Sequence, residues 1–375
     1  MTARAYDVVI IGAGIVGAAC ALACASEGLR TGAVEADMIG GGATGAGMGH
    51  LVVMDDSEAQ FALTRYSQTL WHRLAPEMPE DVEYELCGTI WVAADEEEMD
   101  EVRRKKEFYD AQRVRAEVLD EKALRAAEPN LREGLAGGLR VPGDAVIYAP
   151  CAARFLMEQA RTRGAELHLP RVVTEITTEG VRLNDGTSIA AHWVVNATGT
   201  WSPTLTPGIE VKKRKGHLVI TDRYAGFVKH QLVELGYLKS AHSMTAESVA
   251  FNVQPRRTGQ ILIGSSRQFD VDGKDIDANI MGRMLARAAE FLPGVKKLSA
   301  IRSWTGFRAA TPDKLPLIGP WPGRENLFLA TGHEGLGITT SLGTAKLLVD
   351  QLLRRVSEIP VAPYLPSRIR EKVHA

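Results

Sequence analysis

The chain has 375 residues, a length that predicts about two domains sharing a large interior. Lysine and arginine total 44, aspartate and glutamate total 46, and the net charge is -2. No basic cluster is long enough to follow a phosphate backbone, so this balance argues against a nucleic acid partner.

The cysteines indicate neither a metal centre nor a disulfide framework. Cys20 and Cys24 lie one helical turn apart, and neither Cys87 nor Cys151 has a partner at a metal-ligand spacing. We therefore expect no bound metal, small buried thiols and a reducing, cytoplasmic location.

The uncharged segment from Val8 to Ser26 matches a secretory signal on hydropathy alone. Its glycines, Gly12, Gly14 and Gly17, argue otherwise, because they would weaken a signal helix and each has a use in a nucleotide-binding turn. We interpret the segment as folded structure and expect no transmembrane span.

The first predicted unit is a buried strand, Tyr6–Ile11, followed by a glycine turn and a helix, Ala18–Glu27. In this motif the first glycine permits the turn, the second lets the backbone approach a pyrophosphate, and the third lets the helix pack on the strand. The helix N-terminus adds N–H donors and a positive dipole end. The expected cofactor-binding residues are therefore Gly12, Gly14, Ile15, Val16 and Gly17.

A second strand, Leu29–Val34, ends at Glu35, which lies 18 residues after Gly17. A carboxylate at this place accepts hydrogen bonds from both hydroxyls of an adenosine ribose and disfavours a 2′-phosphate. Strand, glycine turn and acid together predict a dinucleotide site, but they do not separate NAD from FAD.

A second glycine-rich loop, residues 40–50, favours FAD. Side chains are almost absent there, as expected where backbone wraps a flat ring and a phosphate chain, and a nicotinamide enzyme has no obvious need of such a loop. We expect Thr44, Gly47 and Met48 from this loop to contact the cofactor.

Two later segments also have the pattern of a strand that ends in a glycine turn. The first runs from Trp193 to Gly199, and the second runs from Leu327 to His333 and continues into a predicted helix. The amides of the second turn are placed to stabilise negative charge at the N1/C2 edge of a flavin. The expected cofactor contacts here are Ala197, Thr198, Gly199, Gly332, Gly335, Leu336, Gly337, Ile338 and Thr339.

With these motifs the chain resembles, over nearly its whole length, the D-amino-acid-oxidase-like superfamily of FAD enzymes, which includes glycine and sarcosine oxidases and D-amino-acid dehydrogenases. Besides the glycine triplet and Glu35, the matching segments are residues 195–201, 304–308, 311–313, 316–319 and 332–337. The resemblance implies an α/β Rossmann-type FAD domain joined to an α+β substrate domain built on an antiparallel sheet.

The resemblance also implies a discontinuous domain layout. The FAD domain is expected to take residues 1–80, 145–210 and 300–375, and the substrate domain residues 81–144 and 211–299. Local patterns agree, since residues 96–104 form a charged helical stretch and residues 216–221 and 260–265 have the character of strands. In the same family Val173 matches a position whose main chain contacts the adenine.

Within the superfamily, residues 47–56, 215–218 and 264–268 are similar to bacterial hydroxyproline dehydrogenases acting on cis-4-hydroxy-D-proline. Some of these enzymes work with iron–sulfur subunits, so the resemblance implies an electron-transfer partner and a peripheral position at a membrane face. This chain has no iron–sulfur cysteine set of its own. Relatives that bind FAD covalently do so at a position from which His50 is displaced, so noncovalent FAD is expected.

Oxidation of an amino acid at Cα requires a neutral amine, a Cα–H directed at flavin N5 and a held carboxylate, but no side-chain base. Arg308 matches the family's substrate arginine, and its planar guanidinium suits a carboxylate. His333 and His50 are expected beside the flavin ring, where either could form a hydrogen bond to the flavin or to the substrate. Tyr237 is expected as an aromatic lid and Gln254 as a polar contact in the substrate domain.

Three alternatives stay open. A glycine or sarcosine oxidase would use the same chemistry and return electrons to oxygen, and a noncatalytic flavoprotein subunit would only relay electrons. The third alternative is an NAD(P)H-dependent flavin monooxygenase, which would need a second dinucleotide site. No second Gly-x-Gly-x-x-Gly motif follows a predicted strand, so this alternative is the weakest. The main prediction is therefore an FAD-dependent dehydrogenase of a small D-amino or imino acid.

Overall fold

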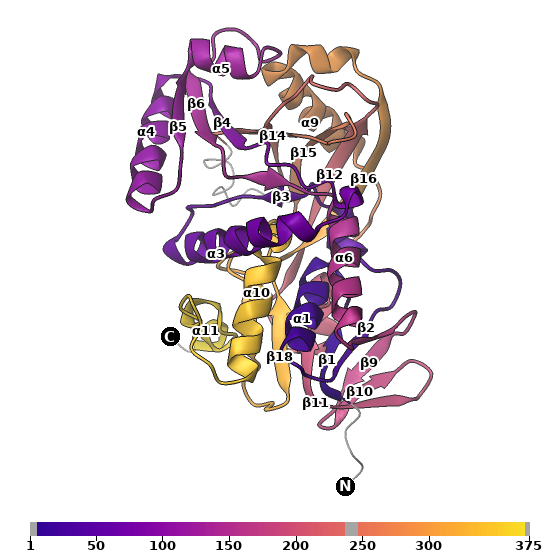
Figure 1. Ribbon diagram of the computed structural model, residues 1–375. Helices are drawn as coiled ribbons and strands as arrows, with labels where there is room; N and C mark the ends of the chain where they lie inside the picture. Colours follow the sequence, from indigo (N-terminus) through magenta and orange to yellow (C-terminus); the bar gives the residue numbers. More distant parts are fainter. Residues whose placement is uncertain (1–5, 237–246, 372–375) are drawn as a thin grey trace.

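The computed structural model describes residues 6–236 and 247–371, and Figure 1 shows them as two sheets, one above the other, each with its own helices. The lower sheet has the order β17-β18-β11-β1-β2-β8, with the β9–β10 hairpin joined to β11. Its strands are β1 (Tyr6–Ile11), β2 (Thr31–Val34), β8 (Glu166–His168), β9 (Val173–Ile176), β10 (Gly180–Leu183), β11 (Ser188–Asn196), β17 (Leu317–Pro320) and β18 (Leu327–Thr331).

The central strands of this lower sheet run parallel, with β1 between β11 and β2. Strand β1 alternates its side chains between two cores: Val8 and Ile10 pack against helices, whereas Val9 and Ile11 pack on the side of the β9–β10 hairpin. The helices on the first face are α1 (Ile15–Ser26), α6 (Ala149–Thr162) and α10 (Gly337–Leu352). Burial on both faces explains why β1 is an uninterrupted apolar run.

The upper sheet is antiparallel apart from the parallel pair β13–β4, and its order is β16-β12-β15-β14-β13-β4-β6-β5. Its strands are β4 (Thr89–Ala93), β5 (Glu117–Asp120), β6 (Gly137–Val141), β12 (Lys212–Thr221), β13 (Gln231–Glu234), β14 (Glu247–Pro255), β15 (Ile261–Gln268) and β16 (Ala300–Ala310). Helix α9 (Ala278–Phe291) covers one face, where Met284 and Phe291 pack against Ile90 and Phe251. Helices α4 (Glu96–Ala111) and α5 (Glu121–Ala127) flank the β4–β6–β5 end.

The predicted fold class, a Rossmann-type domain with an α+β domain on an antiparallel sheet, is confirmed by these two sheets. One segment lies elsewhere than expected. Residues 300–310 were assigned to the cofactor domain, but β16 pairs with β12 from Lys212 to Thr221 and is therefore a strand of the upper sheet. An edge strand of this kind carries no local mark of the sheet that it joins.

The remaining elements lie outside the two large sheets. Helix α3 (Glu58–Leu74) crosses between them in Figure 1 and is tied to α10, since Trp71 Nε1 donates to the Thr339 carbonyl oxygen at 3.1 Å. The others are α2 (Gly42–Ala46), β3 (His50–Leu51), β7 (Ala145–Val146), α7 (Ser202–Leu205), α11 (Ser367–Glu371) and 3-10 turns at 75–77, 80–82, 199–201, 293–297 and 362–364. Within the described residues, no helix has both the length and the apolarity needed to cross a bilayer.

Candidate functional site: a cavity between the two sheets

A cavity of about 690 Å³ lies where the carboxyl ends of β1, β2, β11 and β18 meet the upper sheet. Residues directly after each of these strands line it: Gly12, Glu35, Ala197 and Gly332. In open parallel sheets this edge is where ligands bind, because neighbouring strands leave a crevice there. The cavity therefore brings together four segments that lie far apart in the sequence.

The first glycine turn has the close contacts that its spacing predicts. Gly12 has φ +100°, and a Cβ there would lie 2.9 Å from the Ala197 carbonyl oxygen. A Cβ at Gly17 would overlap the Gly12 carbonyl oxygen, so only glycine lets α1 begin this close to the turn. Gly14, Ile15 and Val16 line the cavity, whereas Gly17 does not. Its expected direct contact with a cofactor therefore becomes an indirect one, through the shape of the turn.

Helix α1 begins at Ile15, three residues before the predicted start, because Thr44 supplies a partner for its first turn. Gly14 is the N-cap residue and offers no side chain, but the Ile15 N–H donates to Thr44 Oγ1 at 3.0 Å. The buried Thr44 hydroxyl thus joins the second glycine-rich loop to the first. The other early N–H groups of such a helix have no intrahelical acceptor and favour an anion.

Glu35 is held in place at the end of β2. Its Oε2 accepts from the Ala13 N–H at 2.7 Å, and its Oε1 accepts from the Asp37 N–H at 2.9 Å. The carboxylate lines the cavity beside the glycine turn, where ribose hydroxyls would reach it. Val173, at the start of β9, lines the same end of the cavity.

The second glycine-rich loop forms α2 and continues along the cavity through Gly47, Met48 and His50. Strand β16 passes close to it, since a Cβ at Gly306 would overlap Ala46 Cβ. The loop is therefore held between the cofactor sheet and the upper sheet.

The turns after β11 and β18 complete this side. Thr198, Gly199, Gly335, Leu336, Gly337 and Ile338 line the cavity, and α10 begins there without a side-chain cap. Thr339 is buried, and its hydroxyl donates to the His50 carbonyl oxygen at 2.7 Å. Because Thr339 does not line the cavity, its expected cofactor contact is replaced by support of the His50 backbone.

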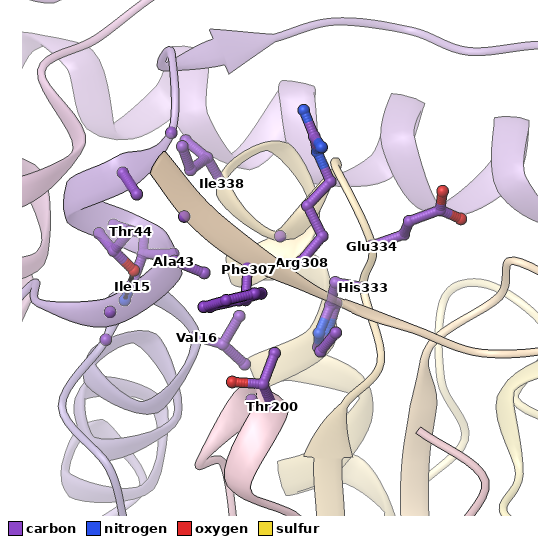
Figure 2. A pocket seen from close by; sticks show the side chains of 18 of the residues that line it. Ile15, Val16, Ala43, Thr44, Thr200, Phe307, Arg308, His333, Glu334 and Ile338 are labelled. Carbon is purple, nitrogen blue, oxygen red and sulfur yellow. Dashed lines mark hydrogen bonds between the residues drawn. The ribbon is translucent and has the colours of Figure 1, made fainter. Parts of the chain in front are cut away.

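Arg308 projects from β16 into the cavity, as Figure 2 shows. The guanidinium passes over Gly216 of β12, where any Cβ would overlap it, and Nη1 donates to the Ser266 carbonyl oxygen of β15 at 3.1 Å. Glycine at position 216 thus makes room for the cation. A guanidinium in a buried cavity presents several donors in one plane, as carboxylate binding requires.

A second arginine lies directly opposite Arg308 in the sheet register. Arg214 of β12 pairs with Arg308 of β16, and like charges in such positions repel. Arg214 forms an ion pair with Glu334, which follows the β18 turn and points away from the Arg308 guanidinium in Figure 2. Glu334 therefore neutralises the charge of Arg214 beside Arg308.

His50 lies close enough to Arg308 for the two to interact electrostatically. Burial, with the positive charge of Arg308, lowers the pKa of His50 to about 4, so the imidazole is neutral at pH 7. Its Nε2 is buried and has no hydrogen-bond partner among the described residues. A neutral imidazole with an unused ring nitrogen beside a guanidinium suits a polar ligand that Arg308 also holds.

His333 also lines the cavity, but its ring is directed toward α10. Its Nε2 shares a 2.9 Å hydrogen bond with Thr344 Oγ1, and in Figure 2 the ring and the Arg308 guanidinium point in opposite directions. Burial lowers the pKa of His333 to about 3. His333 is therefore not directed at a substrate bound by Arg308, as expected, but holds the turn after β18 against α10.

The two other residues expected at the substrate lie elsewhere. Gln254 is buried, does not line the cavity, and donates from Nε2 to the Met48 carbonyl oxygen at 2.9 Å. Its expected contact with a ligand is thus corrected to a contact with the glycine-rich loop. Tyr237 lies outside the described residues.

Sequence reasoning missed a set of polar side chains on the upper sheet. The cavity wall opposite the glycine turns includes Trp91, Gln231, Asn252 and Ser265. Trp91, Gln231 and Asn252 belong to none of the motifs described above, whereas Ser265 lies in the matched segment 264–268. The available signal was a buried polar residue flanked by apolar ones, as in the Phe251-Asn252-Val253 stretch of β14.

These features fit a flavin dinucleotide. The cavity is lined at two uncapped helix N-termini, those of α1 and α10, at the Glu35 carboxylate and at a loop almost without side chains. It continues to a half-buried cation, Arg308, on the upper sheet.

Comparison with known proteins agrees with this fit. Residues 7–351 match the protein-family model described as FAD dependent oxidoreductase. The chain belongs to this family. FAD is accordingly its cofactor, and the chain is an FAD-dependent oxidoreductase.

Relatives within the family resemble the chain over most of their length. A glycine oxidase from Pseudomonas aeruginosa is 31% identical over 384 residues, which cover 96% of this chain and 98% of the relative. A D-amino acid dehydrogenase from Xanthobacter autotrophicus is 29% identical, with coverage of 83% and 74%. The crystal structure of glycine oxidase from Geobacillus kaustophilus superimposes with a TM-score of 0.86 at 28% identity, covering 97% of this chain and 98% of that one.

Proposed function

We propose that the chain oxidises the C–N bond of a small D-amino or imino acid, with Arg308 binding the substrate carboxylate. The observation that carries the proposal is the Arg308 guanidinium, which lies in the same buried cavity as the glycine turns and beside the neutral His50. An amino acid has one anionic end and one reacting C–N bond, and this arrangement provides a cation at a fixed distance from the cofactor turns. The relatives named above are amino acid oxidases and dehydrogenases.

The chain's own residues would orient the substrate. Arg308 grips the carboxylate with two parallel hydrogen bonds, which fixes the orientation of Cα. His50 offers a hydrogen bond to the substrate nitrogen without adding a second positive charge beside Arg308. Bound FAD supplies the acceptor for the hydride that leaves Cα.

The cofactor would be held mostly by backbone. We assign Gly12, Gly14, Ile15 and Val16 to the pyrophosphate, Glu35 to the ribose and Val173 to the adenine. The flavin end is assigned to Thr44, Gly47, Met48, Ala197, Thr198, Gly199, Gly332, Gly335, Leu336, Gly337 and Ile338, all of which line the cavity. All of these residues lie in the segments that we propose for the FAD domain, from which residues 300–310 are moved to the substrate domain because β16 pairs with β12.

The preferred substrate is cis-4-hydroxy-D-proline or D-proline. The cavity supports a compact, partly polar substrate, because apolar Met48, Val52 and Leu218 line it together with polar side chains of the upper sheet. A cyclic imino acid presents an apolar ring and a carboxylate, which this mixed lining suits.

The second candidate is a glycine oxidase type of reaction, in which oxygen accepts the electrons. The glycine oxidase relatives favour it. Peroxide formed in step with glycine consumption would favour this candidate, whereas turnover only with an artificial dye would favour the dehydrogenase.

We also propose noncovalent FAD, electron-accepting partner subunits and a cytoplasmic location at a membrane face. Two apolar side chains at the cavity edge, Met38 and Trp201, are 57% and 53% exposed, and this supports a docking partner near the cofactor. Acid denaturation tests the first proposal, since noncovalent FAD stays in the supernatant. The partner subunits and the location are tested by isolating the protein from native membranes and from cytosol and identifying the proteins that co-purify with it.

The deciding experiment is anaerobic reduction of the purified flavoprotein. The visible flavin absorbance is followed while cis-4-hydroxy-D-proline, D-proline, sarcosine, glycine and D-alanine are added separately. Preferential bleaching by the two cyclic imino acids is the expected result. Bleaching by glycine or sarcosine alone would move the chain to the oxidase candidate, and no bleaching by any amino acid would refute the proposed function.

A further inference from the structure

A row of polar side chains crosses the upper sheet on its cavity side. Trp91 of β4 is the register partner of Val233, Val233 is that of Asn252, and Asn252 is that of Gly264. Register partners lie on the same face, and residues two apart on one strand do so as well, which adds Gln231. The polar row is defined here as Trp91, Gln231 and Asn252.

The opposite face of the same strands is apolar. Ile90, Leu232, Phe251 and Val253 pack in the core under α9, and each is a sequence neighbour of a residue of the polar row. The second face also carries an apolar cluster, which includes Trp91 and Val233, but its polar side chains line the cavity. Packing of the fold does not require polar side chains on the second face.

The row carries hydrogen-bonding capacity that the protein does not use. Trp91 Nε1, Gln231 Oε1 and Asn252 Oδ1 are buried and have no partner among the described residues, and these side chains are only 3%, 3% and 8% exposed. A buried polar group without a partner costs about 1–3 kcal/mol. Such groups in native proteins call for an explanation, and a ligand in the cavity that they line provides one.

The row lies at the right separation from the carboxylate site. The Arg308 guanidinium passes over β12 and bonds to Ser266 of β15, and β14, which carries Asn252, is the next strand. Asn252 pairs with Gly264, two residues before Ser266 on β15. With strands about 4.8 Å apart and a rise of about 3.3 Å per residue, the Asn252 backbone lies roughly 8 Å from Ser266, which the guanidinium contacts. A small amino acid held at its carboxylate by Arg308 would place its far end at Asn252, and Gln231 and Trp91 follow on the next two strands.

The chemistry of the row selects the group at that far end. The Trp91 indole only donates, whereas the amides of Gln231 and Asn252 both donate and accept. A hydroxyl also donates and accepts, so one hydroxyl can use the indole N–H and an amide oxygen together. A second carboxylate would meet Asp56, which also lines the cavity, and an apolar end would leave the row unpaired.

We infer that the polar row Trp91, Gln231 and Asn252 is a specificity site that binds a hydroxyl at the end of the substrate remote from its carboxylate. The inference rests on the proposed function and makes it more specific: the substrate class is a hydroxylated small amino or imino acid. The deoxy analogue binds in the same orientation but leaves the row unpaired, so it reacts more slowly.

The test compares matched substrate pairs on the FAD-loaded enzyme. The kcat/KM for flavin reduction is measured for cis-4-hydroxy-D-proline against D-proline and for D-serine against D-alanine. We expect the wild type to favour the hydroxylated member of at least one pair by roughly 100-fold, because a site built to bind a hydroxyl rejects the analogue that lacks it.

Two variants locate the effect in the row. Asn252→Leu and Gln231→Met replace the amides with apolar side chains of similar size, and each should lower the ratio of the hydroxy to the deoxy kcat/KM about tenfold. Asn279→Leu, an exposed asparagine in the first turn of α9, is the control and should keep the wild-type ratio. Flavin content of each purified variant shows that the cavity has formed.

The outcomes separate the two proposals. Equal rates for both members of each pair in the wild type, or an unchanged ratio in both row variants, would overturn the polar row as a hydroxyl site while the proposed function stands. Turnover of neither pair would overturn both.

Discussion

Replacement of Arg308 by methionine should remove most of the catalytic efficiency without removing the flavin. The side chain lies in the cavity, accounts for part of the low pKa of His50 and donates a hydrogen bond to the Ser266 carbonyl oxygen. Methionine keeps a comparable length but neither the charge nor the planar donors. The carboxylate of a bound substrate would then be buried without a partner.

The size of the effect follows from that burial. Truncation of one partner of a buried, hydrogen-bonded charge pair costs about 2–5 kcal/mol. Since about 1.4 kcal/mol corresponds to a factor of ten, kcat/KM should fall roughly 30- to 5,000-fold. Arg308→Lys keeps the charge but loses the fork, so we expect a smaller fall of about 10- to 100-fold.

The assay is stopped-flow flavin reduction under anaerobic conditions with the best substrate of the panel. Arg302→Met is a matched control, because Arg302 lies on the same strand, is exposed, and lies outside the cavity lining. FAD content should be unchanged in all three variants. If Arg308→Met reacts within about threefold of the wild type with every amino acid, the carboxylate assignment is wrong and a role in electron relay gains support.

Three further predictions concern the cofactor turn and buried titrating groups. Gly17→Ala should yield protein without FAD, because the new Cβ overlaps the Gly12 carbonyl oxygen. Gly282→Ala is the control and should bind FAD normally, since a Cβ there meets nothing within 4 Å. The flavin absorbance of the two purified proteins checks this. Burial lowers the pKa of His333 to about 3, so the unfolded chain binds the extra proton between pH 3 and 6.5 and stability falls as the pH falls through that window. In urea unfolding, His333→Gln should reduce the slope there by about 1.4 kcal/mol per pH unit, and an unchanged slope would contradict the buried neutral imidazole. Burial raises the pKa of Asp144 to about 7, so the protonated carboxyl is favoured in the folded protein and its contribution to the free energy of unfolding is lost as the pH rises from 3.8 to 7. Asp144→Asn should therefore flatten the pH dependence of the free energy of unfolding, measured by urea unfolding across that range.

Much of the cofactor half was predictable because its signals are local. The strand, turn and helix from Tyr6 to Ser26 depend on backbone constraints within a few residues, and glycine at position 12 is needed for a positive φ whatever surrounds it. Glu35 after β2 and the glycine turn after β18 were also predictable from local sequence signals. The predicted start of α1 was three residues late because its first N–H finds Thr44, a partner that lies far along the chain.

The substrate half was less predictable because strand pairing decides which side chains meet. Gln254 and Asn252 lie two residues apart on β14, yet only Asn252 lines the cavity, while Gln254 binds the Met48 carbonyl oxygen. The Arg214–Glu334 ion pair likewise depends on the β18 turn reaching β12. No sequence window contains both members of such contacts.

The sequence by itself determined the cofactor class, the glycine turns and the identity of Arg308 as the substrate-binding cation to test. Only the tertiary structure decided that His333 faces α10, that β16 joins the upper sheet and that Trp91, Gln231 and Asn252 form one row. The physical reason is that backbone geometry is specified by nearest neighbours in the chain, whereas a binding surface is specified by the register of strands that are distant in the chain.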